Sequence, residues 1–296
     1  MNINGTVIDD ASAEAFSSPF ARLIVTGRTG GWAYTAAHEA TGCATSIIDC
    51  GCEAGIEATT DDFKTIDGRP GHSLLFFAKS RKSLESELIK RIGQVCLPTP
   101  TVMVFNGLDK GDDFELGKKI GYFGNGFERD EEKYGRDCVA VPITSGEFLI
   151  EKSVKISKGV AGANFWIYAG SQKSGLKSAE RAVDAIKGMP GLILPFAGGV
   201  VASPSRFGST YATLKASTQE DFCPTISLEK NPARKIPDGV GAIFEIIIDA
   251  VSIEVARDAM KVGIEAACGG GIVKIGAASF GGKLGDIDIP LRELFA

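Results

Sequence analysis

One glutamate stands out as a candidate catalytic acid because of the strand-like segment in which it lies. The segment GAIFEIIIDA covers residues 241–250, and a period of two places Glu245 on one face with Ile243 and Ile247. Apolar neighbours exclude water from a carboxyl group and raise its pKa, because burial disfavours the charged form. A glutamic acid that keeps its proton near neutral pH can act as a general acid. The same pattern also fits a glutamate that is exposed at a sheet edge or paired with a basic residue.

Two glycine-rich segments carry basic side chains that could meet an anionic ligand. The first, PFAGGVVASPSRFGSTYATLKAS at residues 195–217, has paired glycines, a Ser-Pro-Ser sequence and no regular apolar period after Val201. The second, FGGKLG at residues 280–285, places Lys283 beside adjacent glycines but lacks the spacing of a phosphate-binding loop. Glycines allow a ligand or another backbone to come close. A tight turn is an equally good interpretation of the second segment.

Two further glutamates lie in EAGIE, residues 53–57, shortly before the arginine of DGRPG, residues 67–71. We expect Glu53 and Glu57 to lie in a polar connection with Arg69 close behind. Such a connection either faces a ligand or is simply solvated.

The sequence argues against a metal site. Cys50 and Cys52 form half of a possible zinc motif, but the other five cysteines are scattered and no second pair has a matching spacing. The chain has only two histidines, His38 and His72, which also disfavours a Ser-His-Asp triad. We therefore predict that no metal is bound and that the cysteines are small buried thiols.

Composition excludes several classes of protein. The 296 residues are 44% hydrophobic and 23% charged, which predicts a folded chain with a sizeable core. The net charge is -5 and no basic cluster exists, so a nucleic-acid partner is not expected. No apolar run approaches the roughly 18 residues that a membrane span needs. The start of the sequence does not resemble a signal peptide, and seven cysteines suit a reducing cytoplasm.

The elements that must position these residues occur in the same order twice. In the first half we predict strands over 22–27, 44–52, 72–80 and 99–107, with helices over 31–42 and 82–95. In the second half we predict strands over 163–171, 191–199, 242–250 and 272–282, with helices over 177–188 and 252–268. Each half therefore has the order βαββαβ, which is the ferredoxin-like arrangement.

This repetition predicts an α+β fold of two tandem ferredoxin-like lobes related by internal duplication, residues 1–150 and 151–296. One larger α+β domain whose halves are similar by chance is the alternative. Each half also carries an insertion, 108–150 and 198–240. We predict a hairpin from GYFGNGF and CVAVPI in the first insertion and a long loop in the second. Long insertions in compact domains are usually functional.

The motifs taken together resemble those of the formylmethanofuran:tetrahydromethanopterin formyltransferase family. The resemblance runs nearly from end to end of the chain. Besides EAGIE and DGRPG, the segments that carry it are AEAF (13–16), WAYTAAHEATGCATSIIDC (32–50), PTVMVFNGL (100–108), the hairpin-like ERDEEKYGR (128–136), GVAGANFWI (159–167), PFAGGVVAS (195–203), LKAST (214–218), FEIII (244–248) and GGKLG (281–285).

The resemblance implies an activity and a mode of assembly. Members of this family have two ferredoxin-like lobes per chain and work as oligomers without a metal or a prosthetic group. They move a formyl group between the amine of a methanofuran-type carrier and a ring nitrogen of tetrahydromethanopterin. The chain carries no hyperthermophile signature, which favours the methylotroph branch, whose members are subunits of a formyltransferase/hydrolase complex.

The resemblance also assigns roles to particular residues. Glu245 occupies the position of the family's acid/base glutamate. The candidate residues for binding the two substrates are Asn106, Gly107, Asn164, Gly198, Gly199, Ser203, Arg206, Lys215 and Lys283.

The chain departs from the family pattern in its loops. Ala163 replaces a glycine of Gly-Gly-Asn, Gly51 and Cys52 replace Pro-Ala before Glu53, Ala197 replaces a proline and Pro204 replaces a glycine. A non-catalytic scaffold subunit and a formyltransferase that uses a folate-type pterin are the alternative functions. The direction of flux, the carrier's tail, the assembly state and the cleft that binds each substrate stay open.

Overall fold

The computed structural model describes residues 1–47, 49–59, 64–278 and 285–296. Within these residues the α-helices are α1 (Gly30–Thr41), α2 (Arg81–Arg91), α3 (Leu116–Gly121), α4 (Gln172–Ile186) and α5 (Ile253–Ala267). The strands up to the middle of the chain are β1 (Asn2–Ile3), β2 (Thr6–Ile8), β3 (Ser12–Thr26), β4 (Glu53–Thr59), β5 (Gly71–Phe77), β6 (Met103–Asn106), β7 (Asp112–Phe114), β8 (Arg129–Lys133), β9 (Arg136–Ile143) and β10 (Gly146–Glu151). The later strands are β11 (Val154–Ala169), β12 (Leu192–Ile193), β13 (Ser205–Phe207), β14 (Ala216–Thr218), β15 (Ala242–Ala250), β16 (Ile272–Gly276) and β17 (Ile287–Pro290).

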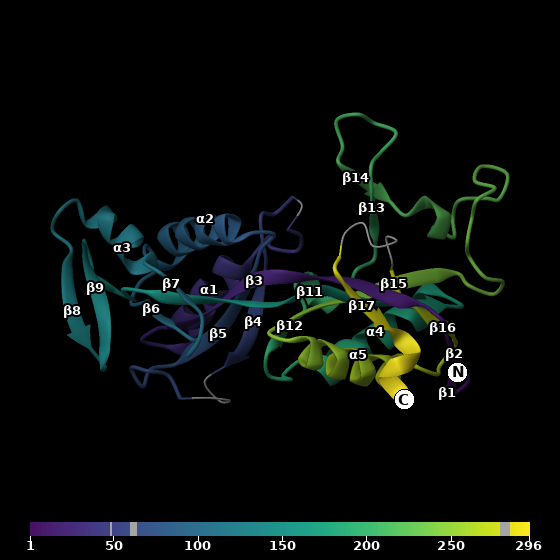
Figure 1. Ribbon diagram of the computed structural model, residues 1–296, viewed down its shortest axis with the longest axis horizontal. Coiled ribbons are helices and arrows are strands. Elements are labelled where there is room, and N and C mark those ends of the chain that lie inside the picture. The colour runs from purple at the N-terminus through teal and green to yellow at the C-terminus, as the bar shows by residue number, and fades with distance from the viewer. Residues whose placement is uncertain (48, 60–63, 279–284) are drawn as a thin grey trace.

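One large mixed sheet joins most of the strands, so the predicted α+β class is confirmed. Its main path is β1-β2-β16-β11-β3-β6-β10-β9-β8, and β4, β5, β7, β12, β15 and β17 pair beside this path. The two longest strands, β3 and β11, are antiparallel neighbours and run along the middle of the elongated molecule (Figure 1). The helices α1 and α2 lie toward one end of these strands, and α4 and α5 lie toward the other.

Two large hydrophobic clusters form the core. The first combines α1 and α2 with β3–β6 and β9–β10, and the second combines α4 and α5 with β11, β15 and β16. The long strands contribute to both clusters: Ala13 and Ala15 at the start of β3 belong to the second, and Val154 and Ile156 at the start of β11 belong to the first. Each half of the chain therefore completes the core of the other.

The sequence pattern of the helices explains where they begin and which face they bury. The Ser80 and Ser252 hydroxyls accept hydrogen bonds from the first-turn amides of α2 and α5, and Ser171 forms a capping box at the start of α4. The predicted stripes of small apolar residues are buried. In α1 these are Ala33, Ala36, Ala37 and Ala40, and in α5 they include Ala256, Met260, Ile264 and Ala267.

The strand predicted over 44–52 is wrong. This segment is turn-like in its described residues, with the Cys50 amide bonded to the Ser46 carbonyl at 2.9 Å and Gly51 in a left-handed conformation (φ +79). The strand instead begins at Glu53, so β4 replaces the polar connection that we expected for EAGIE. Alternating β-formers in a short segment do not form a strand when a turn interrupts the extended backbone.

The first insertion contains a hairpin, and CVAVPI lies in one of its strands as predicted, but GYFGNGF does not form the other strand. GYFGNGF is the end of α3 followed by a turn of 3-10 helix, Tyr122–Gly124. The strands β8 and β9 form the hairpin, joined at Tyr134 and Gly135, which both have positive φ as a tight hairpin turn requires. In the second insertion β13 and β14 form a small hairpin that projects from the body of the molecule (Figure 1).

Candidate active site

Glu245 lies in the middle of β15, on the face of the sheet that the helices leave uncovered. Its neighbours Phe244 and Ile246 point into the cluster beneath α4 and α5, and the period of two turns Glu245 to the opposite face. In the adjacent strand β11, Trp166 is the residue directly opposite Glu245. The strand register therefore places an indole beside this carboxyl group.

The environment of Glu245 favours the protonated acid. The residue is only 5% exposed, and Nε1 of Trp166 donates a 2.8 Å hydrogen bond to its Oε1. Burial raises the pKa of Glu245 to about 7, although the hydrogen bond from Trp166 acts in the opposite direction. Near neutral pH this carboxyl group can therefore both give and take a proton.

The second insertion is attached directly to this strand. The amide of Val201 donates to the Glu245 carbonyl at 2.8 Å, and the Glu245 amide donates to the Val201 carbonyl at 2.9 Å. These two bonds hold the start of the insertion against the edge of β15, beside Glu245. The segment that follows, residues 202–225, covers the sheet next to Trp166 and forms one wall of a cavity.

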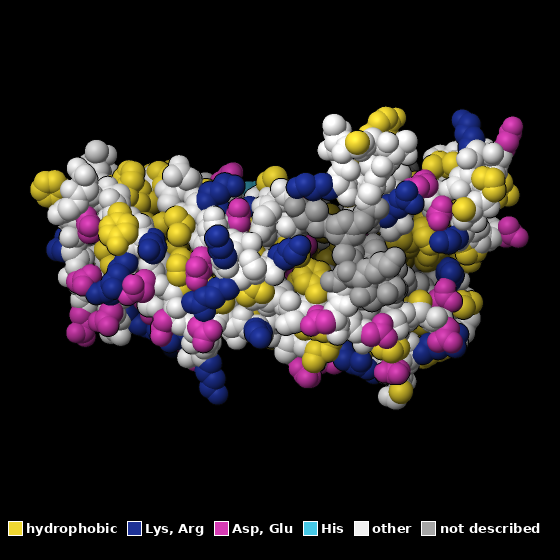
Figure 2. All heavy atoms as spheres, turned by 45° about the horizontal axis from the view of Figure 1, so that its top comes forward, with side chains coloured by type: hydrophobic (Ala, Val, Ile, Leu, Met, Phe, Trp, Pro, Cys, Tyr) yellow, Lys and Arg dark blue, Asp and Glu magenta, His cyan; other side chains and the backbone are white. Residues whose placement is uncertain are grey.

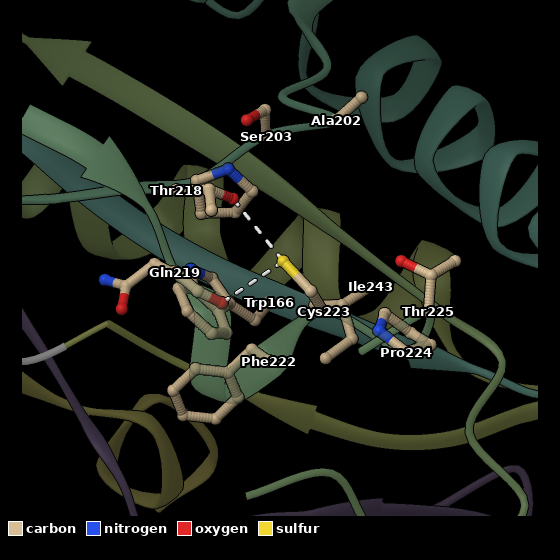
Figure 3. A pocket seen from close by; sticks show the side chains of 11 residues that line it. Trp166, Ala202, Ser203, Thr218, Gln219, Phe222, Cys223, Pro224, Thr225 and Ile243 are labelled. Atoms are coloured by element: carbon tan, nitrogen blue, oxygen red, sulfur yellow. Dashed lines mark hydrogen bonds between the residues drawn. The ribbon is translucent and has the colours of Figure 1, made fainter. Parts of the chain in front are cut away.

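The cavity has a volume of about 150 Å³ and combines an aromatic wall with polar groups (Figure 3). The ring of Phe222 meets that of Trp166 edge-on, with centroids 4.9 Å apart. The thiol of Cys223 lies between Thr218 and Gln219 and contacts the Thr218 hydroxyl and the Gln219 carbonyl at 3.4 Å each. The lining residues are Trp166, Ala202, Ser203, Pro204, Thr218, Gln219, Phe222, Cys223, Pro224, Thr225 and Ile243.

This arrangement can hold a planar heteroaromatic ring. Aromatic side chains stack on or meet such a ring edge-on, and a few hydroxyl and amide groups fix its orientation. Trp166 belongs to the cavity wall and also holds Glu245, so a ligand in the cavity lies one residue away from the buried acid.

Of the predicted binding residues that the structure describes, only Ser203 lines this cavity. Arg206 and Lys215 lie in and beside the projecting hairpin, where Nη2 of Arg206 pairs with Oε1 of Glu220 at 2.9 Å and Lys215 is exposed. Figure 2 shows that basic and acidic side chains are interspersed over this face of the molecule. Lys283 falls outside the described residues.

The paired glycines of the second insertion differ in their surroundings. Both have positive φ, +66 at Gly198 and +73 at Gly199. A Cβ atom at Gly199 would approach the Val183 and Leu194 side chains to 2.9 and 3.0 Å, whereas one at Gly198 would meet nothing within 4 Å. Gly199 is therefore required by close packing against Val183 and Leu194, whereas Gly198 has free space beside it.

The two predicted asparagines are bound within the fold. Oδ1 of Asn106 accepts from the Lys155 amide at 2.9 Å, and its Nδ2 donates to the Leu108 carbonyl. Asn164, which is 3% exposed, accepts from the Ala278 amide at 2.7 Å and donates to the Gly162 carbonyl at 3.1 Å. Asn106 lies in the first half, away from the cavity lining.

Gly107 is also required by its own surroundings. A Cβ atom there would come within 2.7 Å of the Arg22 side chain and 3.1 Å of the Arg22 carbonyl. The tight approach of β3 therefore explains this glycine without a ligand.

The expectation that Arg69 accompanies Glu53 and Glu57 is wrong. Arg69 pairs with Asp67 at 2.7 Å, whereas Glu57 pairs with Arg22. The carboxyl group of Glu57 also accepts hydrogen bonds from the Ser73 hydroxyl at 2.7 Å and from the Gly191 amide at 2.8 Å. Glu53 is only 7% exposed, because β4 is covered instead of solvated.

Sequence reasoning missed Trp166, Phe222 and Gln219. The alternation of GANFWIYAG already places Asn164, Trp166 and Tyr168 on one face, and this signal could have identified the tryptophan. Phe222 and Gln219 lie in an irregular segment, where no period predicts their direction.

Among the described residues no group of three or more His, Cys, Asp and Glu side chains is arranged to hold a metal ion. In the same part of the chain, none of the helices has the length and apolar character that crossing a bilayer demands.

Comparison with known proteins identifies the family. Residues 1–143 match the family model described as "Formylmethanofuran-tetrahydromethanopterin formyltransferase", and residues 146–294 match the model described as "FTR, proximal lobe". Curated formylmethanofuran–tetrahydromethanopterin formyltransferases from Methanothermobacter thermautotrophicus and Methylococcus capsulatus are 47% and 44% identical over 298 and 300 residues, with full coverage of each chain.

Two solved structures have the same fold. The formyltransferase from Methanosarcina barkeri is 44% identical, with a TM-score of 0.91 over all of both chains. A chain of the formyltransferase/hydrolase complex from Methylorubrum extorquens, solved with methylofuran, is 37% identical, with a TM-score of 0.93 over 100% of this chain and 99% of that one. By its sequence and its fold, the chain belongs to the formylmethanofuran–tetrahydromethanopterin formyltransferase family.

Proposed function

We propose that the chain transfers a formyl group between formylmethanofuran, or a methanofuran-like carrier, and a ring nitrogen of tetrahydromethanopterin. Full-length identity of 44–47% to curated formyltransferases supports this activity. The observation that carries the proposal is the buried Glu245 carboxyl group, which is hydrogen-bonded to Trp166 beside an aromatic-walled cavity.

Glu245 acts as the acid/base group of the reaction. Attack of the acceptor nitrogen on the formyl carbon forms a C–N bond and gives a tetrahedral intermediate with a negatively charged oxygen. The protonated Glu245 donates a hydrogen bond to this oxygen or gives its proton to the leaving nitrogen, and the old C–N bond then breaks. The attacking nitrogen loses a proton, which returns to Glu245. Such proton transfer contributes about 10²–10⁴ in rate, and no covalent enzyme intermediate is needed.

The cavity beside Trp166 binds a ring of one of the two substrates. Ser203 supplies a polar contact at its edge, and Arg206, Lys215 and Lys283 attract the negative charges of the long substrates. Gly198 leaves room for close approach, while Gly199 and Asn164 shape the segments beside the cavity. Asn106 and Gly107, in the first half, bind a part of a long substrate that extends away from the cavity. Holding two substrates in register supplies a further large share of the acceleration.

The chain is built as two ferredoxin-like lobes, 1–150 and 151–296, related by internal duplication. Two observations support this division: the family models meet between residues 143 and 146, and there are two large core clusters. In this arrangement β3 and β11 run through both lobes, so neither lobe is a closed unit by itself.

The protein works in the cytoplasm as an oligomer or as a subunit of a formyltransferase/hydrolase complex, without a metal or a prosthetic group of its own. The structural relative from Methylorubrum extorquens, which belongs to such a complex, supports the assembly. Size exclusion of a native extract that contained only a free homo-oligomer would exclude the complex.

The experiment that tests this function is the substitution Glu245→Gln, which keeps the shape and removes the proton. Formyl transfer to tetrahydromethanopterin, followed by pterin absorbance, is expected to fall at least about 100-fold, with substrate binding retained. The exposed Glu229→Gln variant is the control and keeps full turnover. Unchanged turnover of folded Glu245→Gln would overturn the mechanism. A wild-type protein that binds neither substrate is instead a scaffold, and one that prefers a folate-type pterin is a different formyltransferase.

A further inference from the structure

A second pair of buried carboxyl groups lies where the two halves of the chain meet. Asp249 is on β15, four residues beyond Glu245 and on the same face of that strand, and it is 0% exposed. Glu53 is the first residue of β4 in the first half and is 7% exposed. The two side chains lie within hydrogen-bonding reach of each other.

One oxygen of each carboxyl group has no partner if both groups are ionised. Oε1 of Glu53 accepts from the Ile47 amide at 3.4 Å, and Oδ1 of Asp249 accepts from the Gly162 amide at 2.9 Å. The remaining oxygens, Oε2 of Glu53 and Oδ2 of Asp249, are buried and have no hydrogen-bond partner among the residues that the structure describes. One proton between the two groups satisfies both oxygens and removes the repulsion of two buried negative charges.

The electrostatic surroundings of the two acids agree with this geometry. Burial, and then the charge of Asp249, raises the pKa of Glu53 well above its ordinary value, and burial raises that of Asp249 to about 6. The Cys50 thiol also acts on Glu53 in the same direction. The residues paired with Glu53 on β5 and with Asp249 on β12 are the apolar Phe77 and Ile193.

Asp249 holds an irregular point in the pairing of β11 with β15. The register changes between Val160, which is opposite Ala250, and Ala163, which is opposite Ile248. Two residues of β11 therefore stand against Asp249 alone, which is the pattern of a β-bulge. Gly162 is one of these two residues and has a φ of +77. Its amide donates the hydrogen bond that Oδ1 of Asp249 accepts.

The bulge sets which residue of β11 meets Glu245. Beyond it the pairing continues regularly through Asn164 opposite Ile247 to Trp166 opposite Glu245. A slip of one residue would turn Trp166 to the helix-covered face and remove its hydrogen bond to the acid. The group that fixes the bulge therefore also positions the Trp166–Glu245 pair.

We propose that Glu53 and Asp249 share one proton across the junction of the two halves and act as positioning residues for the Trp166–Glu245 pair. Glu53 donates to Asp249, Asp249 accepts from the bulge amide, and the bulge fixes the register of the strands that carry the acid. This goes beyond the proposed function, because the shared proton is a property of the folded chain in the absence of substrate.

The shared proton makes stability fall as pH rises. The folded state holds a proton that the unfolded chain has lost above about pH 4.5, so folding binds a proton and stability falls as pH rises from there until the folded pair has also lost its proton. Glu53→Gln replaces the carboxylic acid with an amide that donates to Asp249 at every pH. Its thermal midpoint is expected to equal that of the wild type near pH 5 and to exceed it by about 2–4 °C at pH 9.

The matched control is Glu57→Gln, the same substitution on the same strand. Glu57 is ion-paired with Arg22 at 2.6 Å. The neutral glutamine side chain leaves the Arg22 guanidinium without its charged partner, so the substitution lowers the thermal midpoint throughout this pH range. Parallel melting curves of wild type and Glu53→Gln from pH 5 to 9 would overturn the shared proton, whatever the catalytic results.

Measurements of kcat then distinguish a positioning role of Glu53 from a purely stabilising one. Glu53→Ala leaves Oδ2 of Asp249 without a donor and is expected to lower kcat about tenfold with little change in KM, since a small misplacement of a catalytic group is costly. Glu53→Gln restores kcat to within about twofold. If folded Glu53→Ala has the wild-type kcat, or if Glu53→Gln does not rescue it, the positioning role is excluded. A failure of Glu245 as the acid would leave the melting result intact, so the two ideas fail separately.

Discussion

Trp166 and Glu245 stand directly opposite each other on neighbouring antiparallel strands, with Nε1 of the indole 2.8 Å from Oε1 of the carboxyl group. This bond opposes the effect of burial on the acid, because a donor stabilises the charged form. Burial and this hydrogen bond together therefore set the pH at which Glu245 loses its proton.

Trp166→Phe removes the donor and keeps an aromatic wall. We expect the pKa of Glu245 to rise above its value of about 7, because the hydrogen bond from Trp166 that lowers it is lost. The alkaline limb of the pH profile of kcat should move to higher pH by about one pH unit, because a hydrogen bond to a charged group usually has that strength. Tyr168→Phe, on the same face of β11, is the control and leaves the profile in place. A downward or absent shift in Trp166→Phe would contradict the assignment.

The two adjacent glycines of the second insertion should respond differently to alanine. Gly199→Ala brings a Cβ to 2.9 Å from Val183 at a φ of +73, so both overpacking and strain destabilise it, by about 2–4 kcal/mol in the free energy of unfolding. Gly198→Ala meets open space and costs only about 1 kcal/mol for its left-handed backbone. Denaturant unfolding measures both values. Equal losses would show that contact with Val183 does not matter.

Arg206 gives a test of substrate attraction. It is exposed and paired with Glu220, and exposed ion pairs contribute about 0–1 kcal/mol, so Arg206→Ala should leave the free energy of unfolding nearly unchanged. Its KM for the anionic substrates should rise about tenfold, and more at low salt.

Arg129→Ala is the matched control for this variant, because Arg129 is also exposed and ion-paired, with Glu147, but lies on β8 far along the sheet from the cavity. Its KM should not change. The same KM in both variants would remove Arg206 from the binding site.

The elements that periodic sequence patterns specify could be predicted. The alanine face of α1 and the apolar stripe of α5 are buried as expected, because helical spacing determines which side chains point inward. Alternation also placed Glu245 among apolar neighbours, and its burial is confirmed. These features depend on local sequence alone.

Features that depend on contacts between distant segments could not be predicted. The burial of Glu53 follows from the meeting of β4 with β15, and the partner of Glu245 follows from the register of β11, which the bulge at Gly162 shifts. The glycines and aromatic residues of GYFGNGF fit a hairpin as well as the end of a helix, so the local sequence does not distinguish the two. Tertiary packing, and not local propensity, decides between a hairpin and a helix end in such a segment.

The most direct test of the account is the titration of the Glu245 carboxyl group itself. Infrared difference spectra between wild type and Glu245→Gln, recorded from acid to alkaline pH, isolate the protonated carboxyl band of this residue. The account predicts that the band disappears with a midpoint at a pH of about 7, together with the loss of kcat. A midpoint near the ordinary value of 4.5 would mean that the acid is ionised during turnover, and would contradict the mechanism.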